Sequence, residues 1–596
     1  MPGPPAEDFL SVASAVPCAI SADGTAVLAL VSDGEGGRLV WISRASGVST
    51  DGPPFEDVVR AVRLGPNDDL LVERATADGL QLVLWRDGSG DTVVDASDRY
   101  HGGAVPDPDG TAVAYARTGS RHNLEVWVVD LATRDRRCLV SADGRWVPLS
   151  FSPDGVLLAV GRLTGRASEN ELALLDLRTA GSWDVSQPGS RSWWGAPEWL
   201  PDSSGFYVST DHDVEFRGIA HYDITTRSWR FELSVDWDLR CHASPDGRML
   251  IVSSNREGET RLEAYPTATM RAARTLDLPA GSTSRAGLFT QDATAYIHPV
   301  ASDTDPGSIW EHDLATGEGR IIFSPLADHP TCLGAETHRF RTFDGLWVPV
   351  VLYRPEGGTD RCPVVVLLHQ APEGQWLRTY NPLAQFLVSR GFAVAAPNLR
   401  GSTGYGKRYH SLDDNRKRLQ PIGDLAHLVV WLRDQDGVDA SRVSLFGTSY
   451  GGHQALTALA NYPKLFSAAV VISPILDLSR FVAAAPPERR GWLEREFGRL
   501  DIYGEVLARL APAATAETIL GRVLVAHAED DPVVPIGEIE SFVGRMDGAR
   551  LMRFQEGGHG LGDAVARAAV MESAVEVFAG GSAEGARWPV TAASST

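Results

Sequence analysis

Short apolar segments separated by polar turns fill the first half of the chain. Clear examples are residues 25–31, 156–160 and 249–252, where aliphatic side chains follow a turn rich in glycine and aspartate. Residues 124–130 alternate apolar and polar positions and end in an aspartate. Such segments are typical of β-strands joined by hairpins, and little in this half has helical spacing.

A turn of the Ser-Pro-Asp-Gly type recurs through this half at a nearly constant distance. Its aspartates stand 41 to 48 residues apart and are Asp23, Asp68, Asp109, Asp154, Asp202, Asp246 and Asp292. A period of about 40–50 residues is typical of propeller blades or of a solenoid. Seven units of about four strands each predict an all-β, seven-bladed β-propeller. A pair of β-sandwiches is the alternative, but it does not explain the regular spacing.

The pattern changes after about Pro325, where apolar runs alternate with stretches of helical spacing. The apolar runs are residues 362–369, 392–397, 443–447, 468–473 and 522–527, and the helical stretches are residues 382–390, 423–435 and 453–461. This is the βαβ pattern of a doubly wound, mostly parallel sheet. We therefore expect a propeller over residues 8–325, an α/β domain over residues 326–579 and a disordered polar tail over residues 580–596.

One short motif in the second half carries chemistry. Residues 447–451 read Gly-Thr-Ser-Tyr-Gly, directly after the apolar strand and at the start of a helical stretch. A sharp strand-to-helix turn forces its central residue into a strained backbone conformation, so the neighbours must be small. The turn lifts the Ser449 hydroxyl above the sheet. The context favours Ser449 as a nucleophile and the α/β domain as an α/β-hydrolase domain.

A serine hydroxyl needs a base held by a carboxylate before it attacks a carbonyl. In α/β-hydrolases the chain order is serine, acid, histidine, each on a loop after a strand. His559 follows the strand at residues 550–554 and is flanked by glycines, which favours it as the general base. The acid candidates follow the strand at residues 522–526 and are Asp530, Asp531 and, less favourably placed, Glu529.

The oxyanion of a tetrahedral intermediate needs two preorganised donors. The first is expected to be the backbone N–H of Tyr450, the residue after the nucleophile. The second is expected from the loop after an early strand, here residues 369–372.

Composition narrows the classes of partner. The chain has 596 residues and a net charge of −22, from 77 acidic and 55 basic residues. Such a surface repels phosphate backbones and anionic head groups, so neither nucleic acid nor a membrane is an expected partner. We expect no secretory signal and no membrane span. Five scattered cysteines indicate neither a disulfide framework nor a zinc site, and a cytoplasmic location is expected.

Four segments resemble the prolyl oligopeptidase family, specifically its acylaminoacyl-peptidase-like branch. Residues 369–376 resemble the family's His-Gly-Gly-Pro-Glu-Gly-Gln segment, and residues 395–406 its Pro-Asn-x-Arg-Gly-Ser-x-Gly-Tyr-Gly segment. Residues 447–452 match the elbow motif. Residues 531–535 match the Asp-x-x-Val-Pro motif, which selects Asp531 over Asp530. The resemblance covers both halves of the chain. It implies cleavage of short peptides, a propeller that restricts access of large folded substrates, and no metal or cofactor.

The chain departs from the family pattern after His369, where Gln370 and Ala371 replace Gly-Gly. The resemblance assigns the second oxyanion donor to the N–H of Ala371, where a Cβ restricts conformations that glycine adopts freely. His453 stands where this branch often has an aromatic residue. Both changes could alter the acyl pocket or favour another acyl substrate.

Three charged residues are further candidates for substrate binding, beside Gln370 and His453. Arg400 and Glu373 lie on loops near the predicted site and could bind a substrate terminus. Asp477, after the strand that ends at Ser473, could line the pocket. The alternative is that such residues form structural ion pairs, which is the commoner role.

Three hypotheses about function follow. The first is a serine peptidase acting on short peptides, as an aminopeptidase, acylaminoacyl-peptidase or oligopeptidase. The second is an esterase, thioesterase or acyltransferase of specialised metabolism with the same acyl-serine intermediate, which Gln370 and Ala371 keep open. The third is a propeller-based interaction protein with a vestigial hydrolase domain, which the complete triad argues against. The sequence is compatible with a homo-oligomer and does not specify the oligomeric state.

Overall fold

The computed structural model describes residues 3–33, 36–65, 67–119, 123–164, 168–325, 330–356 and 361–580, with the backbone alone at 487 and 488. The chain forms two compact units. One holds Val12–Asp328 together with Gly404–Lys407, and the other holds Met1–Ser11, His329–Thr403 and Arg408–Thr596. Residues 581–596 of the predicted tail lie outside the described residues.

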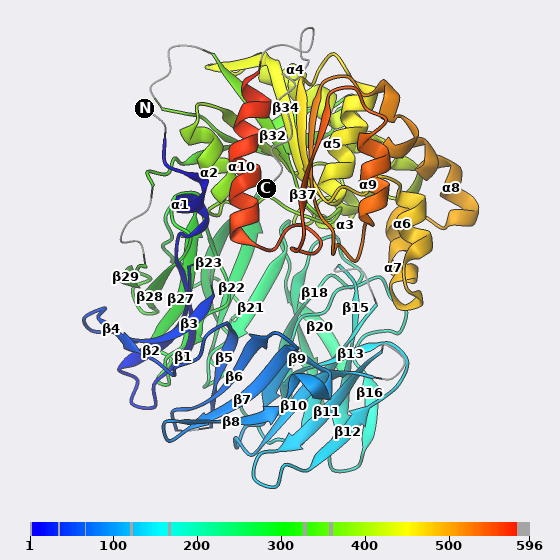
Figure 1. Cartoon of the computed structure of the whole chain (residues 1–596). Coiled ribbons are helices and arrows are strands. Elements are labelled where there is room, and N and C mark those ends of the chain that lie inside the picture. Colours follow the sequence, from blue (N-terminus) through cyan, green and yellow to red (C-terminus); the bar gives the residue numbers. More distant parts are fainter. Residues whose placement is uncertain are drawn as a thin grey trace. The chain divides into compact units, whose positions relative to one another are not determined.

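The first unit consists of antiparallel blades of four strands each, or five in the last, blue to green in Figure 1; one parallel bridge between β11 and β13 joins the third and fourth blades. Blades one to four are β1 (Ser14–Ile20), β2 (Ala26–Ser32), β3 (Gly37–Ser43), β4 (Ser49–Asp51); β5 (Val58–Leu64), β6 (Asp69–Thr76), β7 (Gly79–Arg86), β8 (Ser89–Val94); β9 (Tyr100–Pro106), β10 (Ala112–Thr118), β11 (Leu124–Asp130), β12 (Arg136–Val140); and β13 (Arg145–Phe151), β14 (Leu157–Leu163), β15 (Asn170–Asp176), β16 (Gly181–Asp184). Blades five to seven are β17 (Glu198–Trp199), β18 (Gly205–Thr210), β19 (Gly218–Asp223), β20 (Ser228–Leu233); β21 (Leu239–Ala243), β22 (Met249–Arg256), β23 (Glu259–Pro266), β24 (Arg274–Leu276); and β25 (Ser282–Ser284), β26 (Leu288–Phe289), β27 (Ala295–Ser302), β28 (Ser308–Asp313), β29 (Gly319–Phe323). The seven-bladed propeller predicted from the repeat is confirmed.

The recurring aspartates mark the hairpin between the first two long strands of each blade. In the first blade Ser21 Oγ donates to Asp23 Oδ1 over 2.7 Å and accepts from the Ala26 N–H over 2.9 Å. Blades four and six repeat this arrangement with Ser152 and Ser244. The side chains thus satisfy the backbone groups that a tight hairpin leaves without a ladder partner, which explains the repeat.

The ring closes through packing and one main-chain bond. Ala15 of β1 and Ile309 of β28 belong to the same buried cluster, although they are almost 300 residues apart. The Ala15 N–H donates to the Gly307 carbonyl over 3.0 Å. Within the described residues the last blade draws all its strands from the end of the repeat region, so no strand is exchanged with the first.

The second unit is an eight-stranded sheet with helices on its faces, green to red in Figure 1 apart from the blue α1. Its strands are β30 (Ala335–Arg341), β31 (Trp347–Tyr353), β32 (Cys362–Leu368), β33 (Ala393–Pro397), β34 (Val438–Thr448), β35 (Ala468–Ile472), β36 (Arg522–Ala528) and β37 (Ala549–Phe554), in the order β30-β31-β33-β32-β34-β35-β36-β37. From β33 to β37 all pairings are parallel. The predicted doubly wound α/β sheet is confirmed, and β30 and β31 add an antiparallel edge.

Helices pack against both faces of the sheet over two hydrophobic cores, and α3 spans the boundary because Gly406 and Lys407 cluster with the first unit. The helices are α1 (Ala6–Leu10), α2 (Pro382–Ser389), α3 (Gly406–His410), α4 (Gln420–Leu432), α5 (Tyr450–Asn461), α6 (Leu478–Ala484), α7 (Pro487–Phe497), α8 (Leu500–Arg509), α9 (Ile536–Val543) and α10 (Ala564–Ala579), with short 3₁₀ turns between them. None of the described helices combines the length and the hydrophobicity needed to cross a bilayer.

The first residues differ from the expected boundary. Residues 8–10, expected in the propeller, belong to α1, which packs within the α/β unit. Phe9 is buried edge-to-face against Phe386 of α2, and its carbonyl accepts from the Tyr380 hydroxyl over 2.9 Å. Phe9 belongs to a hydrophobic core of the α/β unit, and its burial there determines where this segment lies. A helix of five residues shows little periodicity in the sequence, so this position was not predicted.

Candidate active site

The nucleophile elbow follows the central strand β34. Ser449 has φ 53° and ψ −111°, a strained conformation for a residue with a Cβ. A Cβ at Gly447 would lie 2.3 Å from the Gly451 backbone, and one at Gly451 would lie 2.6 Å from the Leu368 carbonyl oxygen. The two flanking glycines are therefore required by close backbone approach, as the motif predicted.

Ser449, His559 and Asp531 form a continuous hydrogen-bonded array within the α/β unit. His559 Nε2 lies 2.8 Å from Ser449 Oγ, and His559 Nδ1 lies 2.9 Å and 3.1 Å from the two Asp531 oxygens. Their loops follow β34, β36 and β37, whose carboxyl ends share one edge of the parallel sheet. This is the geometry of a nucleophile, its base and the carboxylate that orients the base.

The two adjacent aspartates have different partners. Asp531 Oδ1 also accepts from the backbone N–H groups of Val533 and Val534, over 2.8 and 3.0 Å. Burial alone would raise the pKa of Asp531, but the hydrogen bonds from His559 and these two N–H groups outweigh it and lower the pKa to about 2. Asp531 therefore stays ionised and can hold the Nδ1–H tautomer of His559.

Asp530 instead supports the loop that carries the base. Its two oxygens accept from the N–H groups of Gly558, over 2.8 Å, and Gly557, over 3.3 Å. Glu529, the third candidate, is paired with Arg553 at 3.4 Å. The geometry thus favours Asp531 as the orienting carboxylate, in agreement with the resemblance.

One supporting residue was missed at the sequence level. His527, at the end of β36, is fully buried, and its Nε2 lies 2.9 Å from the Val534 carbonyl oxygen. This bond closes the turn in which Asp531 accepts its two backbone hydrogen bonds. Burial lowers the pKa of His527. Its place inside an apolar strand resembled a core position, so only the contact reveals its role.

The two predicted oxyanion donors, the N–H groups of Tyr450 and Ala371, do not point toward a common site as expected. The Tyr450 N–H, at the first residue of α5, donates to the Gln370 carbonyl oxygen over 3.3 Å. Gln370 and Ala371 are both exposed. His369 is buried, its Nδ1 lies 2.5 Å from the Ala371 carbonyl oxygen, and burial lowers its pKa to about 4. The buried His369 side chain thus fixes the loop through its contact with the Ala371 carbonyl oxygen.

The other substrate-binding candidates have structural partners. Arg400 is buried between Asp424 at 2.7 Å and Asp344 at 3.0 Å, which raises its pKa. Asp477 caps α6 by accepting from the N–H groups of Ser479 and Arg480. Arg400 therefore forms a structural ion pair, the alternative to substrate binding given above, and Asp477 serves as a helix N-cap.

His453 and Glu373 are also enclosed. His453 is buried, its Nδ1 lies 3.0 Å from the Ile475 carbonyl oxygen, and its ring stacks on that of Tyr450. Burial lowers the pKa of His453 to about 4. Glu373 lies 3.5 Å from His410 Nε2. Both residues could shape the acyl pocket only through their neighbours.

A buried ionic cluster lies behind Tyr450. Arg418 binds Asp413 and Glu496, the latter at 2.8 Å, and its Nη1 lies 3.2 Å from the Tyr450 hydroxyl. Asp413, Asp414 and Glu496 are close enough to share a cation, but the Arg418 guanidinium already supplies positive charge there. We read the cluster as support for Tyr450 rather than as a metal site.

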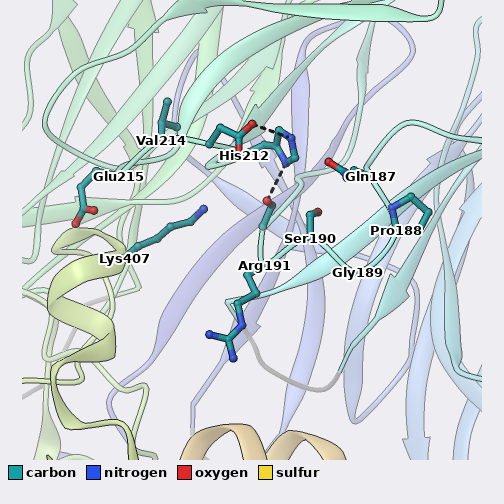
Figure 2. Close-up of a pocket in the computed structure, with 11 residues that line it drawn as sticks. Gln187, Pro188, Gly189, Ser190, Arg191, His212, Val214, Glu215 and Lys407 are labelled. Carbon is teal, nitrogen blue, oxygen red and sulfur yellow. Dashed lines mark hydrogen bonds and ion pairs between the residues drawn. The ribbon is translucent and has the colours of Figure 1, made fainter.

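The propeller unit contains a separate pocket of about 550 Å³, shown in Figure 2. It is lined by residues 187–192 and 212–215 and by Lys407. Lys407 belongs to the short segment of the C-terminal half that clusters with this unit, and its ammonium lies 3.2 Å from Asp211 Oδ1. Ser192 Oγ lies 3.0 Å from His212 Nδ1, and His212 Nε2 lies 3.4 Å from Asp213.

Comparison with known proteins supports this description. Residues 379–580 match the model of the prolyl oligopeptidase family. A segment that covers 33% of this chain is 29% identical to dipeptidyl aminopeptidase BIII of Pseudoxanthomonas mexicana, of which it covers 30%. A segment that covers 24% of this chain is 30% identical to the acylamino-acid-releasing enzyme of Sus scrofa, of which it covers 20%. The matches thus span a third or less of these relatives.

Solved structures share the whole fold. The structure of a puromycin-hydrolyzing peptidase of Mycobacterium tuberculosis superposes with a TM-score of 0.82 and 21% identity, over 97% of this chain and 96% of that one. A structure from a study of two prolyl endopeptidases gives a TM-score of 0.79 at 18% identity, over 96% of this chain and 90% of that one. The match to the prolyl oligopeptidase family model includes Ser449, Asp531 and His559.

Proposed function

We propose that the protein is a serine peptidase that cleaves short peptides through an acyl-enzyme on Ser449. The observation that carries the proposal is the array in which His559 bridges Ser449 at 2.8 Å and Asp531 at 2.9 Å. The strained elbow and the family match support the same reaction. The dipeptidyl and acylamino-acid-releasing activities in the relatives' names favour short peptides as substrates.

The reaction follows from these contacts. His559 Nε2 takes the Ser449 proton as Oγ attacks the substrate carbonyl, and Asp531 stabilises the imidazolium that forms. The resulting oxyanion is stabilised at the amino end of α5, where the Tyr450 N–H and the helix dipole both favour negative charge. His559 then protonates the leaving amine. Water, activated by the same histidine, releases the acyl group and regenerates Ser449.

Acyl transfer to or from another leaving group is the second candidate. The observation that favours it is the exposed Gln370–Ala371 pair, which stands beside the elbow where the family has two glycines. An ester or thioester needs less transition-state stabilisation than an amide, since its leaving group is better. An oxyanion site with one weak donor would penalise amides more than esters.

Hydrolysis of a small panel by the purified protein and its Ser449→Ala variant tests both candidates. The panel holds free-amino, N-acetylated and internally blocked peptide nitroanilides, matched short-chain esters, and puromycin. Ser449-dependent amide cleavage supports the peptidase, and the preferred blocking group identifies the type. Ester turnover without amide turnover supports the acyl-transfer enzyme. Activity that survives Ser449→Ala, or no activity at all, contradicts both.

We also propose a reducing, cytoplasmic setting. All five cysteines are free thiols in the structure, and the protein gains no cross-link from an oxidising compartment. Equal thermal stability with and without a reductant supports this proposal. A stabilisation by mild oxidation that is lost in a cysteine-free variant would contradict it.

A further inference from the structure

The peptide between Gln370 and Ala371 faces the wrong way for catalysis. The bond is trans, because the described residues contain no cis peptide, so its carbonyl oxygen and its N–H point in opposite directions. The Gln370 oxygen accepts from the Tyr450 N–H over 3.3 Å. The Ala371 N–H therefore points away from Tyr450, and a partly negative oxygen lies at the N–H group that the substrate oxyanion requires.

We propose that this peptide is a gate over the oxyanion site, closed in the structure and opened by rotation of the single peptide plane. The inference rests on the proposed function. A rotation of about 180° removes the Gln370 oxygen from Tyr450 and brings the Ala371 N–H to the same place. One movement thus converts an acceptor that blocks the site into the second donor of the oxyanion hole.

The surroundings permit this rotation and little else. The Ala371 carbonyl is fixed from two sides, by His369 Nδ1 and by the Gly374 N–H at 3.0 Å. His369 is itself held by Ser402 Oγ at 3.2 Å, and a Cβ at Gly374 would lie 2.7 Å from the His369 ring. Gln370 and Ala371 are exposed, so the plane between them can turn without repacking the core.

The side chain of Ala371 determines the cost of opening. Ala371 is absent from the residues with positive φ, so its closed conformation is an ordinary one for an L-residue. A peptide rotation changes ψ of Gln370 and φ of Ala371 by about 180°, which takes Ala371 to positive φ. Glycine adopts positive φ freely, whereas a Cβ makes it unfavourable. Replacement of the family's glycine by Ala371 therefore stabilises the closed gate.

Replacement of Ala371 tests the gate. We expect Ala371→Gly to raise kcat roughly fivefold to thirtyfold, with a KM that stays within about twofold, because the gate opens as the oxyanion forms. Ala371→Val, which adds β-branching at the same exposed position, lowers kcat. The affinity for a peptide boronate, which forms a tetrahedral adduct on Ser449, rises with Ala371→Gly by the same factor as kcat. The affinity for the product peptide does not change.

Controls separate this inference from the proposed function. Ala142→Gly changes an exposed alanine of the propeller and leaves kcat unchanged, and melting curves check that each variant folds. If no variant shows Ser449-dependent hydrolysis or boronate binding, the proposed function is wrong and the gate with it. If the wild type is active and Ala371→Gly changes neither kcat nor boronate affinity by more than twofold, the gate alone is overturned. Activity that appears only in Ala371→Gly supports both.

Discussion

Two regions of this protein contain a serine, a histidine and an aspartate in contact, and they differ in how the surrounding structure supports them. In the α/β unit Ser449 contacts His559, which contacts Asp531. In the propeller Ser192 contacts His212, which lies 3.4 Å from Asp213; the two dashed lines at His212 in Figure 2 mark these contacts. The same three residue types are within reach in both places.

The difference lies in the support behind each residue. The Asp531 side chain is fully buried and accepts two backbone hydrogen bonds, whereas the Asp213 side chain is 87% exposed. Ser449 stands on a strained turn at the start of a helix, whereas Ser192 has no positive φ. His212 packs against Trp194 and Trp229. Contact among three side chains is therefore insufficient, because catalysis also needs a carboxylate that is held in place and a serine that the backbone positions for attack.

Removal of the two serines should separate the regions most strongly. Ser449→Ala is expected to lower kcat by about 10⁶-fold, since Ser449 Oγ is the hydroxyl that contacts His559 Nε2 among the described residues. Ser192→Ala should leave kcat within about twofold and change only the melting temperature slightly. Steady-state hydrolysis of the best panel substrate measures both. A large loss of activity in Ser192→Ala would show that the propeller site takes part.

The two adjacent aspartates give the next largest contrast. Asp531→Asn is expected to lower kcat by about 10³–10⁴-fold, because the amide cannot hold the Nδ1–H tautomer of His559. Asp530→Asn keeps an oxygen for one of the two glycine N–H groups, so we expect a loss of about tenfold or less. Similar losses in the two variants would mean that the His559 loop, rather than the tautomer, determines the rate.

The two regions also differ in the pKa of a buried carboxyl, that of Asp211 in the propeller and that of Asp531 in the α/β unit. Burial raises the pKa of Asp211, against the effects of the Trp193 N–H and of Lys407, whereas the pKa of Asp531 is lowered to about 2. A raised pKa means that the folded state retains a proton longer than the unfolded chain, so Asp211 costs stability as the pH rises above its unfolded pKa. A lowered pKa means that Asp531 contributes stability above its unfolded pKa of about 3.8, which is lost as the pH falls toward 2.

Lys407→Met tests the first of these effects. The variant leaves Asp211 with the Trp193 N–H as its main donor, and we expect a loss of about 1–3 kcal/mol in the stability of the propeller. The loss should be larger at pH 8 than at pH 5, because the variant removes the ion pair with the ionised carboxylate as well as the pH-independent hydrogen bond from Lys407 Nζ to the Asp211 main-chain carbonyl. Chemical denaturation at the two pH values measures it. Asp211→Asn combined with Lys407→Met should restore part of the stability, and a loss independent of pH would contradict the account.

Much of the fold was predictable because it repeats or follows local patterns. The recurring aspartates mark one hairpin per blade, and their bonds span only two to five residues, so sequence spacing reports them directly. The strands and helices around Ser449 match the predicted ones within a few residues. The antiparallel strands β30 and β31 and the packing of α1 were not predicted, because edge strands and short helices lack a strong periodic signal.

The sequence by itself determined the period of the blades, the parallel sheet and the order of Ser449, Asp531 and His559, since each depends on neighbouring residues or on a known segment. Only the tertiary structure assigned partners to Arg400 and His453, because their acceptors, Asp424 and the Ile475 carbonyl, lie 24 and 22 positions away and reach them only through packing. It also placed the Gln370 oxygen on the Tyr450 N–H, 80 positions further along the chain. The direction of a peptide plane is set by such distant hydrogen bonds, which no spacing encodes.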